Sequence, residues 1–214
     1  PKEMAELCDV VITCLPSPKA CSEVMESEDG VIAGLKEGKV WLEMSTTDEA
    51  EIRRIGTIVE STGALPIDCP VSGGCHRADT GNISIFAGCK REAFDKALPI
   101  LTTMGRRVLH TGDLGTASTL KVMTNYLATV NLVSISEALT TMKVLGMDMN
   151  VTYEAIKASS GNSFVHETES QVILNGSRDI SFTMDLVSKD VGIFNEPFFG
   201  AVAHHNGNPN GCID

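Results

Sequence analysis

The sequence predicts an α/β domain built on a parallel sheet, followed by an all-α domain. In the first part of the chain, strand-like and helix-like segments alternate in the order strand, helix, strand, helix, strand. This order is typical of βαβ units with right-handed crossovers. From about residue 115 to 145 the apolar residues recur at helical spacing, and further helical segments follow.

The predicted strands are short apolar runs rich in β-branched residues. They cover residues 9–15 (DVVITCL), 39–44 (KVWLEM) and 64–68 (ALPID). Nearly unbroken apolar runs are typical of strands buried on both faces, as in parallel sheets. After the second run, Ser45-Thr46-Thr47-Asp48 offers N-cap side chains to a helix that reaches about residue 61.

Two more strands are expected at 83–88 and 107–112, on either side of a helix over 91–104. A helix as long as 115–145 normally packs against other helices, which places a domain boundary near Leu114. Helices are also expected over 150–159, 164–174 and 184–196. Beyond Glu196 the helical pattern fails, and Gly, Asn and Pro accumulate. The predicted division is therefore 1–114, 115–196 and an irregular tail, 197–214.

The composition disfavours several classes of function. The chain has 28 acidic and 17 basic residues, a formal charge of −11, and an acidic surface repels nucleic acid. No apolar run has the length of a membrane span. The seven cysteines form no C-x-x-C pair and are odd in number. We therefore expect reduced thiols, a cytoplasmic location, and no metal site, because no Cys/His cluster has zinc-ligand spacing.

The segment GTASTLKVMTNYL at 115–127 contains the first candidate site. Lys121 and Asn125 are four residues apart, which places them on one face of a helix. Partial burial lowers the pKa of a lysine toward the range useful for proton transfer. An asparagine beside it supplies a donor and an acceptor without charge. On spacing alone, a surface lysine on an apolar helix is the more frequent explanation.

The segment DCPVSGG at 68–74 leaves a buried strand and turns on two glycines. The carboxyl ends of parallel strands are where open α/β sheets bind ligands. The Ser72 hydroxyl and the backbone N–H groups of Gly73 and Gly74 suit a carboxylate or another anion. An ordinary tight turn explains the same residues.

Leu15-Pro16 and Ser45-Thr46-Thr47 end two neighbouring strands, so they form one wall of a crevice at the edge of the predicted sheet. Helix capping accounts for Ser45 equally well. A further pair, Lys189-Asp190, lies in a predicted helix, where such a pair is more often a solvated face than a site.

In this order, the segments resemble the β-hydroxyacid dehydrogenase family, which includes 3-hydroxyisobutyrate dehydrogenase and tartronate semialdehyde reductase. DCPVSGG resembles the family's substrate-binding loop. The spacing G-x5-K-x3-N, made here by Gly115, Lys121 and Asn125, resembles its catalytic signature. The resemblance runs from about residue 1 to 196.

The resemblance implies an oxidoreductase that interconverts a small 3-hydroxy acid and its semialdehyde or oxo acid with NAD or NADP. Lys121 is then the general acid and base, and Asn125 positions the substrate or the lysine. The substrate carboxylate is held by Ser72, Gly73 and Gly74. The cofactor-binding residues are Leu15, Pro16, Thr46 and Lys189. Family habit also implies a homo-oligomer.

The family's G-x-G-x-x-G unit, which binds the pyrophosphate, is absent from the sequence. The resemblance therefore implies the C-terminal part of a Rossmann-type sheet, joined to part of an all-α domain by a long helix. We expect the chain to be a fragment that binds cofactor poorly by itself. The alternative is a non-catalytic relative that acts as a binding or scaffolding module, although such relatives are expected to lose the lysine found here at position 121.

Overall fold

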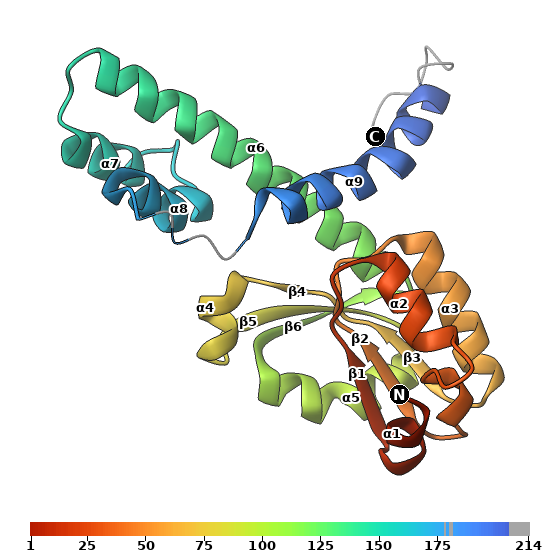
Figure 1. Cartoon of the computed structure of the whole chain (residues 1–214). Helices are drawn as coiled ribbons and strands as arrows, with labels where there is room; N and C mark the ends of the chain where they lie inside the picture. Colours follow the sequence, from red (N-terminus) through yellow and green to blue (C-terminus); the bar gives the residue numbers. More distant parts are fainter. Residues whose placement is uncertain (178, 180–181, 206–214) are drawn as a thin grey trace. The chain divides into compact units, whose positions relative to one another are not determined.

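The computed structural model describes residues 1–177, 179 and 182–205, with side chains as far as residue 194 (Figure 1). The sheet part contains α1 (Lys2–Leu7), β1 (Val10–Thr13), α2 (Pro18–Glu26), the 3-10 helix η1 (Ile32–Gly34), β2 (Val40–Glu43), α3 (Glu49–Ser61), β3 (Leu65–Asp68), β4 (Val71–Ser72), α4 (Gly74–Asp79), β5 (Ile83–Gly88), α5 (Arg91–Met104) and β6 (Gly105–Gly112). The helices α6 (Thr116–Val144), α7 (Met149–Lys157), α8 (Phe164–Asn175) and α9 (Met184–His205) follow.

The sheet is mixed, with strand order β1-β2-β3-β5-β4 and β6 paired to β5. β1, β2 and β3 run parallel, as predicted, and β6 runs parallel to β5. β5 runs antiparallel to both β3 and β4. The 14-residue helix α5 is long enough for a crossover between parallel strands, whereas β4 and the six-residue α4 return the chain in the opposite direction.

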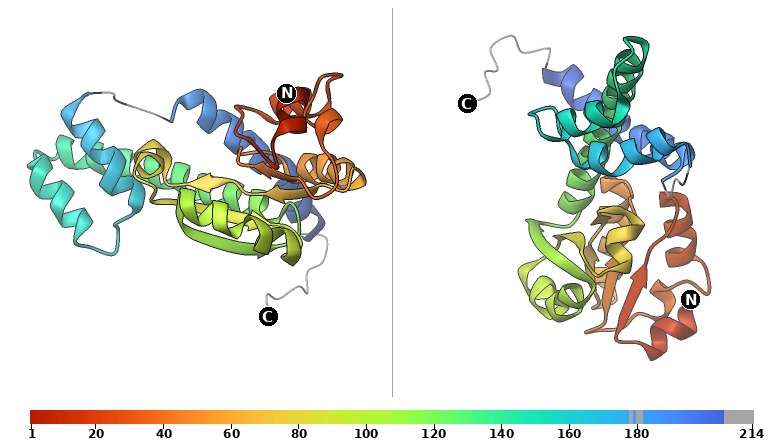
Figure 2. Two further views of the ribbon diagram at one scale, coloured as in Figure 1. Left: turned by 90° about the horizontal axis from the view of Figure 1, so that it is seen from below. Right: turned by 90° about the vertical axis from the view of Figure 1, so that its left-hand side faces the viewer.

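Alternate side chains of the central strands pack on opposite faces of the sheet. Trp41 packs with Val11, Ile52 and Ile55 under α2 and α3. Its neighbour Leu42 packs with a second cluster, which includes residues of β3, β5 and α5. Figure 2 shows α3 and α5 on opposite faces of the sheet. This two-sided burial confirms the predicted α/β fold class and explains why the strands are so uniformly apolar.

By internal contacts the chain forms two compact units, residues 1–123 with 188–214, and residues 124–187. The division falls inside α6, because Ala117, Lys121 and Val122 in its first turns are buried. The predicted boundary near Leu114 lies instead just before α6 begins. The predicted limits of 1–114 and 115–196 therefore stay a prediction about sequence domains.

The second unit contains the rest of α6 with α7 and α8, and its two short helices are capped by side chains. Asp148 accepts hydrogen bonds from the first turn of α7, and Ser163 accepts one from His166 in α8. His166 is fully buried, and its ring nitrogens contact Ser170 Oγ at 2.9 Å and the Tyr153 carbonyl at 3.0 Å. These contacts satisfy the imidazole inside the helical unit, so it acts there as a core residue.

Helix α9 extends to His205. The irregular tail predicted to start at 197 is therefore wrong over 197–205, and its remainder, 206–214, lies outside the described residues. A proline has a φ close to that of a helix and removes only one backbone hydrogen bond, so Pro197 did not end the helix. None of the described helices is both long enough and apolar enough to cross a membrane.

Candidate active site

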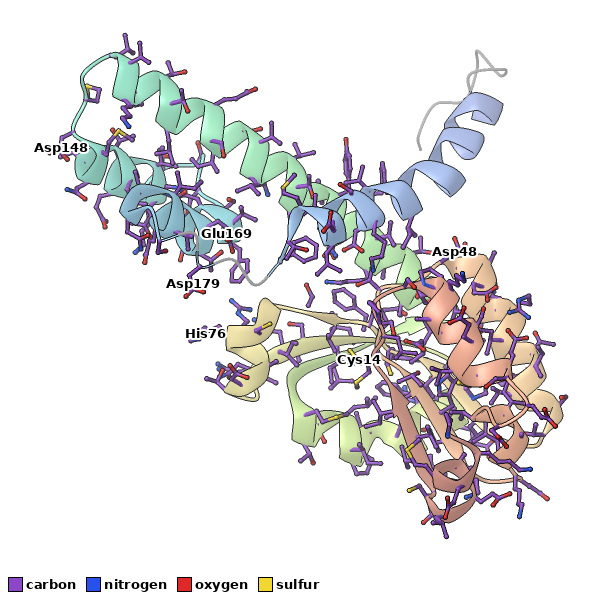
Figure 3. All side chains as sticks on the ribbon, viewed as in Figure 1. Cys14, Asp48, His76, Asp148, Glu169 and Asp179 are labelled. Carbon is purple, nitrogen blue, oxygen red and sulfur yellow. The ribbon has the colours of Figure 1, made fainter. Side chains whose placement is uncertain are left out.

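The candidate site lies in the sheet unit, at the carboxyl ends of β1, β2 and β3 and at the start of α6. Figure 3 shows the side chains, with Cys14 labelled just beyond the end of β1 and Asp48 labelled at the start of α3. Asp48 is the N-cap of α3 and accepts a hydrogen bond from Glu51 N. The first turn of α3 therefore begins directly after the Ser45-Thr46-Thr47 segment.

Lys121 lies on the second turn of α6 with only 8% of its surface exposed. Burial lowers the pKa of Lys121 to about 8, and the charge of Lys189 lowers it further, while the charge of Asp190 opposes the shift. A lysine with this pKa exchanges a proton near neutral pH, as a general acid and base must.

Lys189 and Asp190 lie beside Lys121. Lys189 Nζ is 2.9 Å from Asp190 Oδ1, and it donates a hydrogen bond of 3.1 Å to the Thr46 carbonyl. Asp190 is only 3% exposed. The interpretation of this pair as a solvated helix face is therefore wrong, and the structure brings Lys121, Lys189 and Thr46 to one place.

The substrate loop predicted at 72–74 is a tight reversal between β4 and α4. Gly73 and Gly74 have φ of +130° and +73°, where residues with a Cβ are strained. A Cβ at Gly73 would also lie 2.7 Å from the Arg77 side chain. Ser72 and Gly73 are half-buried and Gly74 is exposed, so the N–H groups at the start of α4 are placed at the surface.

Leu15 and Ser45 are joined at the ends of their strands, because Leu15 N donates a 2.7 Å hydrogen bond to Ser45 Oγ. Pro16 is exposed beside the half-buried Leu15. Asn125 lies on α6 one turn after Lys121, in the part of the helix that belongs to the second compact unit.

The analysis of the sequence missed the role of Glu43. This carboxylate is fully buried and accepts hydrogen bonds from Thr13 Oγ1 at 2.6 Å, Cys21 Sγ at 2.9 Å and Ser45 N at 2.7 Å. Trp41 Nε1 in turn donates to Thr13 Oγ1 at 2.8 Å. Glu43 therefore ties the end of β1 to the end of β2. An acidic residue inside an apolar run was the signal available in the sequence.

Asp68 was quoted only as the first letter of the DCPVSGG motif. It is fully buried and accepts hydrogen bonds from Ser118 N at 2.8 Å and from Ser118 Oγ at 2.6 Å. Burial raises the pKa of Asp68 to about 6, although the bonds from Ser118 and Gly115 oppose the shift. Asp68 thus joins the end of β3 to the first turn of α6.

Gly88, the last residue of β5, lets α6 approach the sheet. A Cβ there would lie 2.8 Å from Asp113 O, 2.9 Å from Thr116 Oγ1 and 3.1 Å from Ala117 N. Two of these atoms belong to backbone that cannot rotate away. We expect Gly88→Ala to lower the free energy of unfolding by about 1–3 kcal/mol, measured by urea denaturation. Gly81→Ala, at a turn with open space, controls for glycine loss; an unchanged midpoint for Gly88→Ala would refute the close approach.

The end of the sheet fits the nicotinamide part of a dinucleotide. Leu15 and Pro16 offer an apolar surface, and Lys189 offers a cation beside Thr46. Thr47 Oγ1 is buried and has no hydrogen-bond partner among the described residues, so a donor or acceptor for a ligand is left over here.

The phosphates have no comparable group. A cavity of about 520 Å³ beside Lys189 is lined by Pro18, Lys19, Ser22, Asp48, Glu51, Lys189, Gly192 and Ile193. Its two lysines are balanced by two carboxylates, so its charge does not favour a phosphate. No group of three potential metal ligands occurs in the part of the chain that the structure describes.

Comparisons with known proteins agree with this geometry. Residues 1–112 match the family model of the NAD binding domain of 6-phosphogluconate dehydrogenase. Residues 115–201 match the model described as NAD-binding of NADP-dependent 3-hydroxyisobutyrate dehydrogenase. These matches define the class, an α/β protein of the NAD(P)-dependent type. The chain belongs to the β-hydroxyacid dehydrogenase family.

Among relatives, the chain is 31% identical to 2-(hydroxymethyl)glutarate dehydrogenase of Eubacterium barkeri, over 90% of this chain and 64% of the relative. It is 32% identical to NAD-dependent L-serine dehydrogenase of Pseudomonas aeruginosa, over 88% and 65%. A crystal structure of 3-hydroxyisobutyrate dehydrogenase from Salmonella typhimurium superposes with a TM-score of 0.86 at 25% identity, over 94% of this chain and 70% of that one. The chain thus spans less than two thirds of the length of these two curated relatives.

Proposed function

We propose that this chain is part of an NAD(P)-dependent oxidoreductase that interconverts a small 3-hydroxy acid and its semialdehyde or oxo acid. The observation that carries the proposal is the buried Lys121, whose pKa of about 8 lies beside Lys189 and Asp190. A buried lysine with these neighbours has little structural reason to be there, because burial of its charge disfavours folding.

The cofactor, when bound, exchanges a hydride with the carbinol carbon of the substrate. In the oxidation, neutral Lys121 accepts the proton of the substrate hydroxyl, and in the reduction the ammonium form returns a proton to the carbonyl oxygen. Asp190 keeps the ammonium form accessible, whereas Lys189 favours the neutral form. The balance between them sets the pKa near the working pH.

The remaining roles concern orientation. Ser72, Gly73 and Gly74 supply donors for the substrate carboxylate, and Asn125 positions the substrate or the lysine. Leu15, Pro16, Thr46 and Lys189 contact the nicotinamide end of the cofactor. Support for the substrate class comes from the relatives: 2-(hydroxymethyl)glutarate, 3-hydroxyisobutyrate and L-serine are all small acids with a hydroxyl on carbon 3. The choice between NAD and NADP, a homo-oligomer and a cytoplasmic location stay predictions.

The pH dependence of turnover tests the proposal. Below pH 8 Lys121 is mainly protonated, so the oxidation is expected to slow about tenfold per pH unit as the pH falls. The reduction needs the protonated form, so it is expected to slow as the pH rises above about 8. Both rates are measured with NAD and NADP on a panel of 3-hydroxy acids, using the longest natural form of the protein.

Profiles that change in the same direction for oxidation and reduction would contradict the role of Lys121. Saturable cofactor binding without turnover of any hydroxy acid would favour the alternative of a non-catalytic binding or scaffolding module.

A further inference from the structure

We propose that Asp68 is a positioning residue, which fixes the first turn of α6 to the end of β3 and thereby sets Lys121 relative to the Ser72–Gly74 loop. The catalytic meaning of this inference rests on the proposed function, whereas the structural link does not. Sequence neighbours cannot make the link, because Asp68 and Ser118 are 50 residues apart.

The start of α6 lacks its own cap. The first N–H groups of a helix have no partner within the helix, and the side chain of the preceding residue usually accepts one of them. Here that residue is Gly115, which has no side chain and a φ of +92°. A Cβ at Gly115 would lie 2.8 Å from Glu49 Cγ, so a capping side chain is also excluded by space.

Asp68 replaces both halves of the missing cap. In a capping box, one side chain accepts from the N–H of the third helical residue, and a second accepts from the N–H of the cap residue. Ser118 is the third residue of α6, and its N–H and hydroxyl bind the two oxygens of Asp68 at 2.8 and 2.6 Å. The same carboxylate accepts from the backbone of Gly115. One residue of the sheet therefore satisfies the donors at the start of the helix.

A carboxylate suits this place for a physical reason. The N-terminus of a helix carries partial positive charge, and a fully buried group has no water to replace lost donors. The groups that act on Asp68 besides these donors are Glu43, which raises its pKa, and the thiols of Cys69 and Cys89, whose own pKa values are raised by burial. The carboxylate is thus charged at neutral pH and loses its charge in mild acid.

Lys121 follows Ser118 by three residues, which is about one helical turn. Asp68 precedes the Ser72–Gly74 loop by four residues, across Cys69, Pro70 and Val71. Asp68 therefore stands between the group that exchanges the proton and the group that holds the substrate carboxylate. A displacement of about 1 Å between such groups lowers turnover up to about 10²-fold.

The test compares Asp68→Asn with Asp113→Asn. Asp113 is an exposed carboxylate just before α6, so its variant makes the same chemical change without touching the link. On this chain, the pKa of Lys121 is followed by NMR of ¹³C-labelled lysine, and exchange of the Ser118 amide is measured. On the longest natural form, kcat and KM are measured from pH 5 to 9.

For Asp68→Asn we expect a changed Lys121 pKa, faster Ser118 exchange and a kcat lower by about 10- to 100-fold. The acid inflection near pH 6 should disappear, while the KM for the cofactor stays within about twofold. Asp113→Asn should change none of these. Ser118→Ala removes only the hydroxyl donor, so it should change them in the same direction by a smaller factor.

An unchanged Lys121 pKa and kcat in Asp68→Asn would overturn the proposal, as would an equal effect of Asp113→Asn. If Asp68→Asn does not fold, Ser118→Ala decides by the same two measurements. If Lys121 responds to Asp68 but the wild-type protein turns over no hydroxy acid, the link stands and the proposed function fails.

Discussion

Replacing Lys121 with alanine is expected to lower turnover by about 10²–10⁴ and to leave cofactor binding unchanged. The change removes the group that exchanges the proton of the substrate hydroxyl. The buried cation costs desolvation energy, so its loss should not destabilise the fold greatly. The measurements are steady-state kinetics on the longest natural form and a fluorescence titration with reduced cofactor.

Two variants serve as controls for this result. Lys143 is an exposed lysine in the last turn of the same helix, so Lys143→Ala should keep full turnover. Lys121→Arg keeps the charge but cannot give up a proton near neutral pH, so it should be nearly as slow as the alanine variant. Turnover retained by Lys121→Ala would remove this residue from the mechanism.

Replacing Glu43 with alanine is expected to lower the free energy of unfolding of the sheet unit by about 2–4 kcal/mol, because buried donors lose their acceptor and a cavity forms. Thr13 has a second acceptor, the Leu42 carbonyl at 3.5 Å, but Cys21 and Ser45 N lose the one that the structure shows. Trp41 is the chain's single tryptophan and is fully buried in this unit. Its fluorescence in a urea titration therefore reports the sheet unit itself.

Glu43→Gln keeps the volume and one acceptor oxygen, so it should recover at least half of the loss. Glu3→Ala, which removes an exposed glutamate from α1, should have no effect beyond about 0.5 kcal/mol. A midpoint for Glu43→Ala equal to that of Glu3→Ala would show that the network around Glu43 does not stabilise the unit.

The sequence was informative wherever one residue type had a single physical explanation. Unbroken apolar runs such as DVVITCL predicted buried parallel strands, and β1, β2 and β3 form them. The order of the DCPVSGG and G-x5-K-x3-N motifs predicted the family, which the two family models confirm. The burial of Lys121 was expected from its proposed chemistry, and the structure places it there.

Features that depend on distant partners were not predictable. Asp68 and Glu43 look like single acids at strand ends, and their roles arise from Ser118, Thr13 and Cys21, which the fold brings to them. The antiparallel direction of β5 depends on the turn through α4, and the start of the second compact unit depends on how much of α6 the sheet buries. Local propensity contains none of this information.

The hydrogen-bond chain from Trp41 through Thr13 to Glu43 also restricts how this sequence can diverge. Each member satisfies a polar group of the next, so a single replacement leaves a buried partner unsatisfied, and a neutral route requires paired changes. Leu15 and Ser45 hang on the same chain through Ser45 N. Residues that never meet a ligand are thereby inherited together with those at the cofactor end of the sheet.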